Sequence, residues 1–137
     1  MAAERIDGKA IADEIKKEAA AEAAALKAQG VEPCLAVILV GNDSASQVYV
    51  NNKKKACEAV GIRSVSYTLD ENAEESELLQ LVDTLNLDSS VHGILVQLPL
   101  PEHMDETKVI VAISPEKDVD CFHPMNVGRL TSGLDGF

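Results

Sequence analysis

Residues 34–61 read CLAVILVGNDSASQVYVNNKKKACEAVG, and this stretch decides the fold. Its first seven residues are an unbroken apolar run, which is typical of a β-strand that is buried on both faces. Residues 41–43 form a short turn, and either Asp43 or Ser44 can cap the helix that follows. Gly61 ends that helix. A buried strand that leads directly into a helix is the building unit of α/β proteins with parallel sheets.

The same alternation of strands and helices continues on both sides of this stretch. Further helices are predicted over residues 7–28, 74–86 and 107–113, with another beginning near residues 126–131, and further strands over residues 63–69, 92–98 and 119–122. In the first helix, apolar residues recur at helical spacing at Ile11, Ile15, Ala19, Ala23 and Leu26. Such an order predicts a sheet that is covered on both faces. We therefore expect one α/β domain of three layers, α/β/α, around a mainly parallel four-stranded sheet.

The composition of the 137-residue chain argues against several classes of protein. Its 23 acidic and 12 basic residues give a net charge of −11, and only 3% of the residues are aromatic. Both features argue against binding of nucleic acid. No apolar run is long enough to span a bilayer, and the N-terminal region lacks a secretory core. Three cysteines without a CxxC pair suit reduced thiols. We therefore expect a cytoplasmic protein without a membrane partner.

Lys53 stands out because of its place on the predicted helix. At 100° per residue, one face of this helix carries Tyr49, Lys53, Ala56, Cys57 and Val60. Lys54 and Lys55 point the opposite way, to water. A lysine in an apolar stripe is costly unless its amine reaches a cavity or a polar partner, or escapes to solvent by snorkelling. Tyr49, four residues earlier, is its neighbour on the helix surface.

Three segments follow predicted strands at the sheet edge where ligands bind in open parallel sheets. They are residues 41–43, 96–99 and 118–120. Gln97 is polar in an otherwise apolar strand, and its amide needs a hydrogen-bond partner. The amine of a lysine on the neighbouring helix would serve, and so would the backbone of the following loop.

Asp118 and Asp120 are two residues apart, so in an extended chain their side chains share a face. Solvation of both carboxyl groups, or the capping of a helix, explains such a pair of aspartates as well as a binding role does. A metal site made of Asp118, Asp120, Cys121 and His123 lacks a recognisable ligand spacing, so we expect no metal. The chain also has no GxGxxG and no GxxxxGK[ST] motif. That absence argues against a short-chain dehydrogenase with a Tyr-Lys catalytic pair.

Three stretches together resemble the methylenetetrahydrofolate dehydrogenase/cyclohydrolase family, specifically its N-terminal, folate-binding catalytic domain. They are VGNDSASQVYVNNKKKACEAVGI, GILVQLPLP and PEKDVDCFHPMNVGRL, and they stand in the family's order and spacing. By this resemblance the catalytic residues are Lys53, Tyr49 and Gln97, and the substrate-binding residues are Tyr49, Gln97, Leu98, Pro99 and Asp120. The family motif usually reads Asp-Val-Asp-Gly, whereas here Cys121 follows Asp120. A glycine at that position permits a backbone angle that cysteine resists.

The resemblance implies a bifunctional, homodimeric enzyme of one-carbon metabolism and purine biosynthesis. The family oxidises 5,10-methylenetetrahydrofolate to the methenyl form, usually with NADP, and hydrolyses that form to 10-formyltetrahydrofolate. A second, Rossmann domain binds the dinucleotide, and residues 120–137 resemble the start of the connection to it. We therefore expect residues 1–137 to carry the folate-side residues, no cofactor-binding residue and little dehydrogenase activity. The alternatives are a non-catalytic folate-binding fragment and an unrelated short-chain oxidoreductase fragment.

Overall fold

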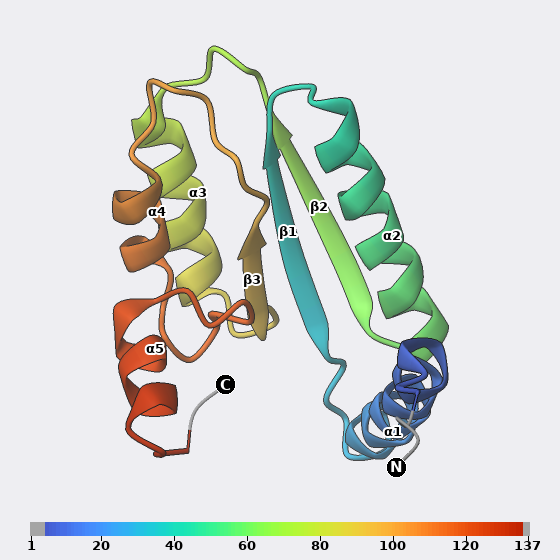
Figure 1. Cartoon of the computed structure of the whole chain (residues 1–137). Coiled ribbons are helices and arrows are strands. Elements are labelled where there is room, and N and C mark those ends of the chain that lie inside the picture. Colours follow the sequence, from blue (N-terminus) through green and yellow to red (C-terminus); the bar gives the residue numbers. More distant parts are fainter. Residues whose placement is uncertain (1–4, 136–137) are drawn as a thin grey trace.

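Three parallel strands form the central layer of the computed structural model, which describes residues 5–135 (Figure 1). In the sheet, β1 (Cys34–Val40) lies between β2 (Arg63–Leu69) and β3 (Gly93–Val96). The helices are α1 (Gly8–Ala28), α2 (Ser44–Val60), α3 (Glu75–Leu87), α4 (Glu106–Ala112) and α5 (Pro124–Thr131). α2 covers one face of the sheet, and α3 and α4 lie on the other. The predicted three-layer α/β/α fold is confirmed.

The prediction of a fourth strand at residues 119–122 is wrong, and the described residues form a sheet of three strands. Asp118 makes one isolated parallel bridge to Ile94, and the chain turns immediately afterwards. The carboxyl group of Asp118 accepts hydrogen bonds from the backbone of Phe122 and His123. These bonds fold the segment back on itself, so its backbone groups are not free to extend the sheet.

Side chains of β1 alternate between two hydrophobic layers. Ala36, Ile38 and Val40 belong to the larger layer, which is built with α3 and α4. This layer also contains Leu78, Val82, Leu85, Ile94, Val109 and Ile113, all at most 6% exposed. Val37 and Leu39 point to the other face, where a smaller layer includes Val50 of α2. Burial on both faces explains why the sequence of β1 is apolar without alternation.

The apolar stripe predicted on α1 is mostly uncovered by the described part of the chain. Ala23 is buried, whereas Ile11 and Ile15 are 47% and 58% exposed. α1 lies beside the end of α2 rather than over the sheet, so only a short part of its surface is packed (Figure 1). Among residues 5–135, no helix has both the length and the apolar run needed to cross a bilayer.

Candidate functional site

Lys53 on α2 meets Gln97, the first residue after β3. The Nζ of Lys53 donates a hydrogen bond of 3.1 Å to Oε1 of Gln97. The Nε2 of Gln97 in turn donates to the carbonyl oxygen of Leu98 at 2.8 Å, and the backbone N–H of Gln97 donates to Ile38 at 2.9 Å. Gln97 is therefore tied to the sheet, and its carbonyl oxygen is turned toward the lysine. Of the two partners that the sequence left open for this amide, the lysine amine and the loop backbone, the structure shows both.

The face of α2 that carries Lys53 differs from the predicted one. Ser46 and Val50 are buried, whereas Tyr49 is 59% exposed and Ala56 is exposed. Lys53 is partly exposed and lies at the border of the buried face, because α2 is rotated toward the sheet on its Ser46–Val50 side. This border position lets the stem of Lys53 pack while its amine reaches the end of β3.

A pocket of about 220 Å³ joins Lys53 of α2 to two of the three predicted sheet-edge segments, residues 96–99 and 118–120, while residues 41–43 line a neighbouring pocket. The first of these pockets is lined by Lys53, Val96, Gln97, Leu98, Asp120 and Phe122. Burial raises the pKa of the Asp120 carboxyl above its ordinary value, the positive charge of Lys53 opposes this rise, and the nearby Asp118 adds to it. Within residues 5–135, the Asp120 carboxyl accepts no hydrogen bond. The pocket therefore presents the amine of Lys53 and a carboxyl group that accepts no hydrogen bond from residues 5–135.

Two of the predicted site residues lie beside this pocket rather than in its lining. Tyr49 is one helical turn before Lys53 and is largely exposed. Pro99 lines a neighbouring pocket of about 180 Å³, together with the turn that follows β1. Phe122 was not predicted, although it lines the pocket and is one of two phenylalanines in the chain. The sequence offered one signal for Phe122: it is an aromatic residue two positions after Asp120, in a chain with few aromatic residues.

The segment around Asp118 caps a helix and does not form a metal site. No group of three His, Cys, Asp or Glu side chains within residues 5–135 is placed to hold a metal ion. Asp118 accepts the N–H of His123, and Nδ1 of His123 accepts the N–H of Met125 at the start of α5. Cys121 has φ of 56°, in the left-handed region that favours glycine. The substitution of cysteine at this position therefore stores strain of about 1 kcal/mol.

The turn that follows β1 does not fit the pyrophosphate of a dinucleotide. Asp43 caps α2 and accepts the N–H of Ser46 at 2.7 Å. These hydrogen bonds lower the pKa of the Asp43 carboxyl, which is therefore ionised near neutral pH. In a dinucleotide fold the phosphates occupy this helix N-terminus. Here a carboxylate takes that place and would repel them.

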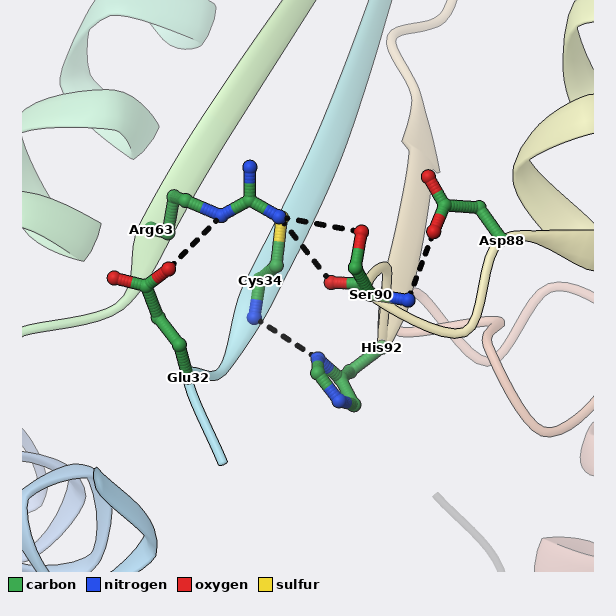
Figure 2. Close-up of polar contacts among 6 residues, drawn as sticks. All are labelled: Glu32, Cys34, Arg63, Asp88, Ser90 and His92. Carbon is green, nitrogen blue, oxygen red and sulfur yellow. Dashed lines mark hydrogen bonds and ion pairs between the residues drawn. The ribbon is translucent and has the colours of Figure 1, made fainter. Parts of the chain in front are cut away.

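A second polar cluster lies at the opposite, amino end of the strands (Figure 2). Nε of Arg63 lies 3.4 Å from Oε2 of Glu32, and Nη2 of Arg63 donates to the carbonyl and hydroxyl oxygens of Ser90. The N–H of Cys34 donates to Nδ1 of His92. Arg63, Glu32, Ser90 and His92 help to line a pocket of about 370 Å³, which is larger than the pocket beside Lys53.

The cysteines are free thiols, in agreement with the expectation of reduced cysteines. Cys34 and Cys57 both line an apolar pocket of about 260 Å³ near the amino end of the sheet. Burial raises the pKa of each thiol above its ordinary value. Such thiols are poor nucleophiles, so Cys57 is best explained as a packing residue, as the sequence suggested.

Most of the chain matches a known protein family. Residues 6–120 match the family described as "Tetrahydrofolate dehydrogenase/cyclohydrolase, catalytic domain". The chain is 63% identical over 132 residues to the "Bifunctional protein FolD" of Campylobacter hominis, and 61% identical over 132 residues to that of Agathobacter rectalis. Each alignment covers 96% of this chain, but only 46% and 47% of the two relatives. The chain therefore spans about half the length of the curated relatives that it matches.

Solved structures give the same result. A bifunctional methylenetetrahydrofolate dehydrogenase/cyclohydrolase from Campylobacter jejuni superposes with a TM-score of 0.94 at 55% identity, over 96% of this chain and 47% of that one. The corresponding protein from Trypanosoma brucei, solved with NADP cofactor and an inhibitor, superposes with a TM-score of 0.87 at 43% identity. That match covers 93% of this chain and 44% of the other.

Proposed function

Because the chain belongs to the tetrahydrofolate dehydrogenase/cyclohydrolase family, we propose that it supplies the folate-binding catalytic part of a bifunctional enzyme. The enzyme oxidises 5,10-methylenetetrahydrofolate to 5,10-methenyltetrahydrofolate with NADP and hydrolyses the product to 10-formyltetrahydrofolate. One observation carries the proposal. The Lys53–Gln97 hydrogen bond and the partly buried Asp120 carboxyl share one pocket at the carboxyl end of the sheet.

Asp120 is proposed to hold the pterin. A reduced pterin offers a ring N–H and an adjacent amino group side by side, and one carboxylate can accept both. The Asp120 carboxyl is partly buried and accepts no hydrogen bond from residues 5–135, so the ligand would supply its missing donors. Tyr49 lies one turn before Lys53 and can cover a ring face, with Leu98 and Pro99 at the other side of the ring.

Lys53 is proposed to transfer protons during hydrolysis. Water attacks the cationic methenyl carbon, the bond between that carbon and N5 breaks, and N5 takes up one proton. The second proton of the water molecule is released. The amine of Lys53 is the proton-transferring group of the proposed pocket, and Gln97 holds it in place through Oε1. Because Nε2 of Gln97 is bound to Leu98, its amide keeps this orientation.

NADP would accept the hydride from the methylene carbon. The capped turn after β1 does not fit its pyrophosphate. The part of this chain in the oxidation is therefore to orient the folate ring, since hydride transfer needs mainly correct placement of two rings. The related T. brucei protein was solved with NADP cofactor, which supports the choice of cofactor for the family.

A homodimer in the cytoplasm, acting in one-carbon metabolism and purine biosynthesis, completes the proposal. The exposed apolar residues of α1 and α5 support an assembly with further protein surface, because patches of this kind favour association. Ile15 and Leu130 are 58% and 65% exposed.

A non-catalytic folate-binding role is the second candidate, because the chain spans about half the length of its relatives. Hydrolysis of methenyltetrahydrofolate by the 137-residue chain separates the two. A rate above the uncatalysed rate supports catalysis, whereas tight folate binding without any hydrolysis supports the non-catalytic role.

The experiment that tests the proposal compares folate affinity in wild type, Asp120→Ala and the control Asp83→Ala. Asp83 is an exposed acid on α3. Removal of the charged acceptor should raise the Kd of a tetrahydrofolate analogue by about tenfold or more, as measured by calorimetry, while the control is unchanged. Wild-type affinity should also weaken on acidification at a higher pH than for an ordinary aspartate, because burial raises the pKa of Asp120. Equal affinity in Asp120→Ala and wild type would count decisively against the assignment.

A further inference from the structure

A buried pair of polar side chains adjoins the turn that carries Asp120. Asp118 is 3% exposed and Asn126 is 2% exposed. Nδ2 of Asn126 donates to Oδ2 of Asp118 at 2.9 Å and to the carbonyl oxygen of Pro115 at 2.8 Å. Asn126, on α5, therefore clamps the segment that leads into the Asp120 turn, at Pro115 and Asp118, to the helix that follows the turn.

Asp118 holds the turn at its far end as well. Its Oδ1 accepts the N–H of Phe122 at 3.3 Å, its Oδ2 accepts the N–H of His123 at 2.9 Å, and its carbonyl oxygen accepts the N–H of Cys121 at 3.3 Å. The residue itself is bridged to Ile94 of β3. The bridge to Ile94 therefore fixes the start of the turn to the sheet, and the hydrogen bonds to the Asp118 carboxyl fix its end.

The Asp118 carboxyl is balanced by N–H donors rather than by a cation. Within residues 5–135 it takes part in no ion pair. A buried acid of this kind is costly unless its acceptors are satisfied, and packing alone would be served as well by an apolar residue. The backbone strain at Cys121 also indicates that the turn is held in place. A residue in the left-handed region persists only where its surroundings hold it there.

We propose that Asp118, clamped by Asn126, is a positioning residue for folate recognition, which fixes the turn so that the Asp120 carboxyl faces the pocket. This inference rests on the proposed role of Asp120 in holding the pterin. Asp118 itself is buried behind the turn and does not line the pocket. It acts through Asp120, so its removal lowers folate affinity only as long as Asp120 is present.

A double-mutant cycle on the full chain tests this directly. Asp118→Asn keeps the shape of the side chain but replaces one acceptor oxygen with a donor. It should raise the Kd of a tetrahydrofolate analogue by about tenfold, because a hydrogen bond to a charged group is lost and the turn loosens. In the Asp120→Asn background the same substitution should change the Kd by less than about twofold. An equal loss in both backgrounds would mean a purely structural role and would overturn the inference, as would wild-type affinity in folded Asp118→Asn.

Hydrogen exchange of the Phe122 and His123 amides gives an independent measurement. Both amides should exchange faster in Asp118→Asn and keep their wild-type rates in Asp120→Asn; unchanged exchange in Asp118→Asn would overturn the inference. If Asp118→Asn does not fold, Asn126→Ala carries the same cycle, with an expected rise in Kd of about threefold from the loss of one donor. Failure of the proposed function has a different signature, because the wild-type chain would then bind no folate analogue at all.

Discussion

The two ends of the parallel sheet both carry a polar cluster beside a pocket, but the clusters differ in how their groups are satisfied. At the amino end, Arg63 is paired with Glu32 and Ser90, and His92 accepts the backbone N–H of Cys34 (Figure 2). At the carboxyl end, Lys53 is bound to Gln97, while the partly buried Asp120 accepts no hydrogen bond from residues 5–135. Groups that are paired within the fold contribute to its stability, whereas the Asp120 carboxyl is available to the ligand that we propose for this pocket.

Pocket size alone would favour the amino end over the proposed site. The pocket at the amino end, of about 370 Å³, exceeds that beside Lys53, of about 220 Å³. The side chains of Arg63 and Glu32 are 41% and 61% exposed, so their ion pair is solvated and its groups neutralise each other. The carboxyl end is also where ligands bind in open parallel sheets. The chemistry of the lining is therefore the better guide.

Lys53→Met should have the largest effect of the three substitutions, because it removes the amine from the pocket at the carboxyl end of the sheet. Hydrolysis of methenyltetrahydrofolate should fall by about 10²–10⁴-fold, because the proton-transferring group is lost. Melting should change little, since methionine keeps the packed stem of the side chain. Lys54→Met, one residue along the same helix and exposed, is the matched control in a stopped assay of formyl product. A rate in Lys53→Met equal to that of the control would remove the main difference between the two ends.

Gln97→Leu should have an intermediate effect. It removes the acceptor of the Lys53 hydrogen bond, so the amine loses its orientation and the hydrolysis rate should fall by about tenfold. The steady-state rate at saturating substrate is the measurement, and Gln80→Leu, exposed on α3, is the control. If Gln97→Leu kept the full rate, the Lys53–Gln97 bond would be structural, like the bonds at the amino end.

Arg63→Ala should have the smallest effect, and it concerns stability alone. Loss of a solvated ion pair should lower the free energy of unfolding by about 0.5–1 kcal/mol in urea titration. The rate of methenyl hydrolysis should stay within about twofold of wild type, with Lys16→Ala on α1 as the control for removal of an exposed charge. A tenfold loss of hydrolysis would instead place the amino end in the reaction, and the contrast between the two ends would no longer hold.

Local patterns predicted the central elements well and failed where a neighbouring element decides the outcome. β1 and β2 have the predicted bounds, and so does α2, because an apolar run, a capping aspartate and Gly61 are all local signals. The same helical period placed Tyr49 and Ala56 on the buried face, but both are exposed. Periodicity gives the spacing of a stripe, while its direction depends on the sheet against which the helix packs.

The proposed site shows the same difference between what local patterns predict and what the packing of neighbouring elements decides. Lys53, Gln97 and Asp120 were identified from residue type and from the family resemblance, and the fold brings all three to one pocket. Phe122 and Asn126 were not identified as site residues. Asn126 is an ordinary polar residue in sequence, and its importance comes only from its burial against Asp118. A fourth strand was predicted where side-chain hydrogen bonds to the backbone compete with the sheet.

The sequence by itself determined the α/β class and the β1–α2 unit, and it suggested the residues of the proposed site. These depend on local propensity, composition and motif order, which can be read along the chain. Only the tertiary structure decided that Lys53 donates to Gln97, that Asp120 shares their pocket, and that Asp118 is buried. These are contacts between segments far apart in sequence, and they depend on the order of the strands and the way the helices pack on them. No local pattern encodes a hydrogen bond between residues that are 44 positions apart.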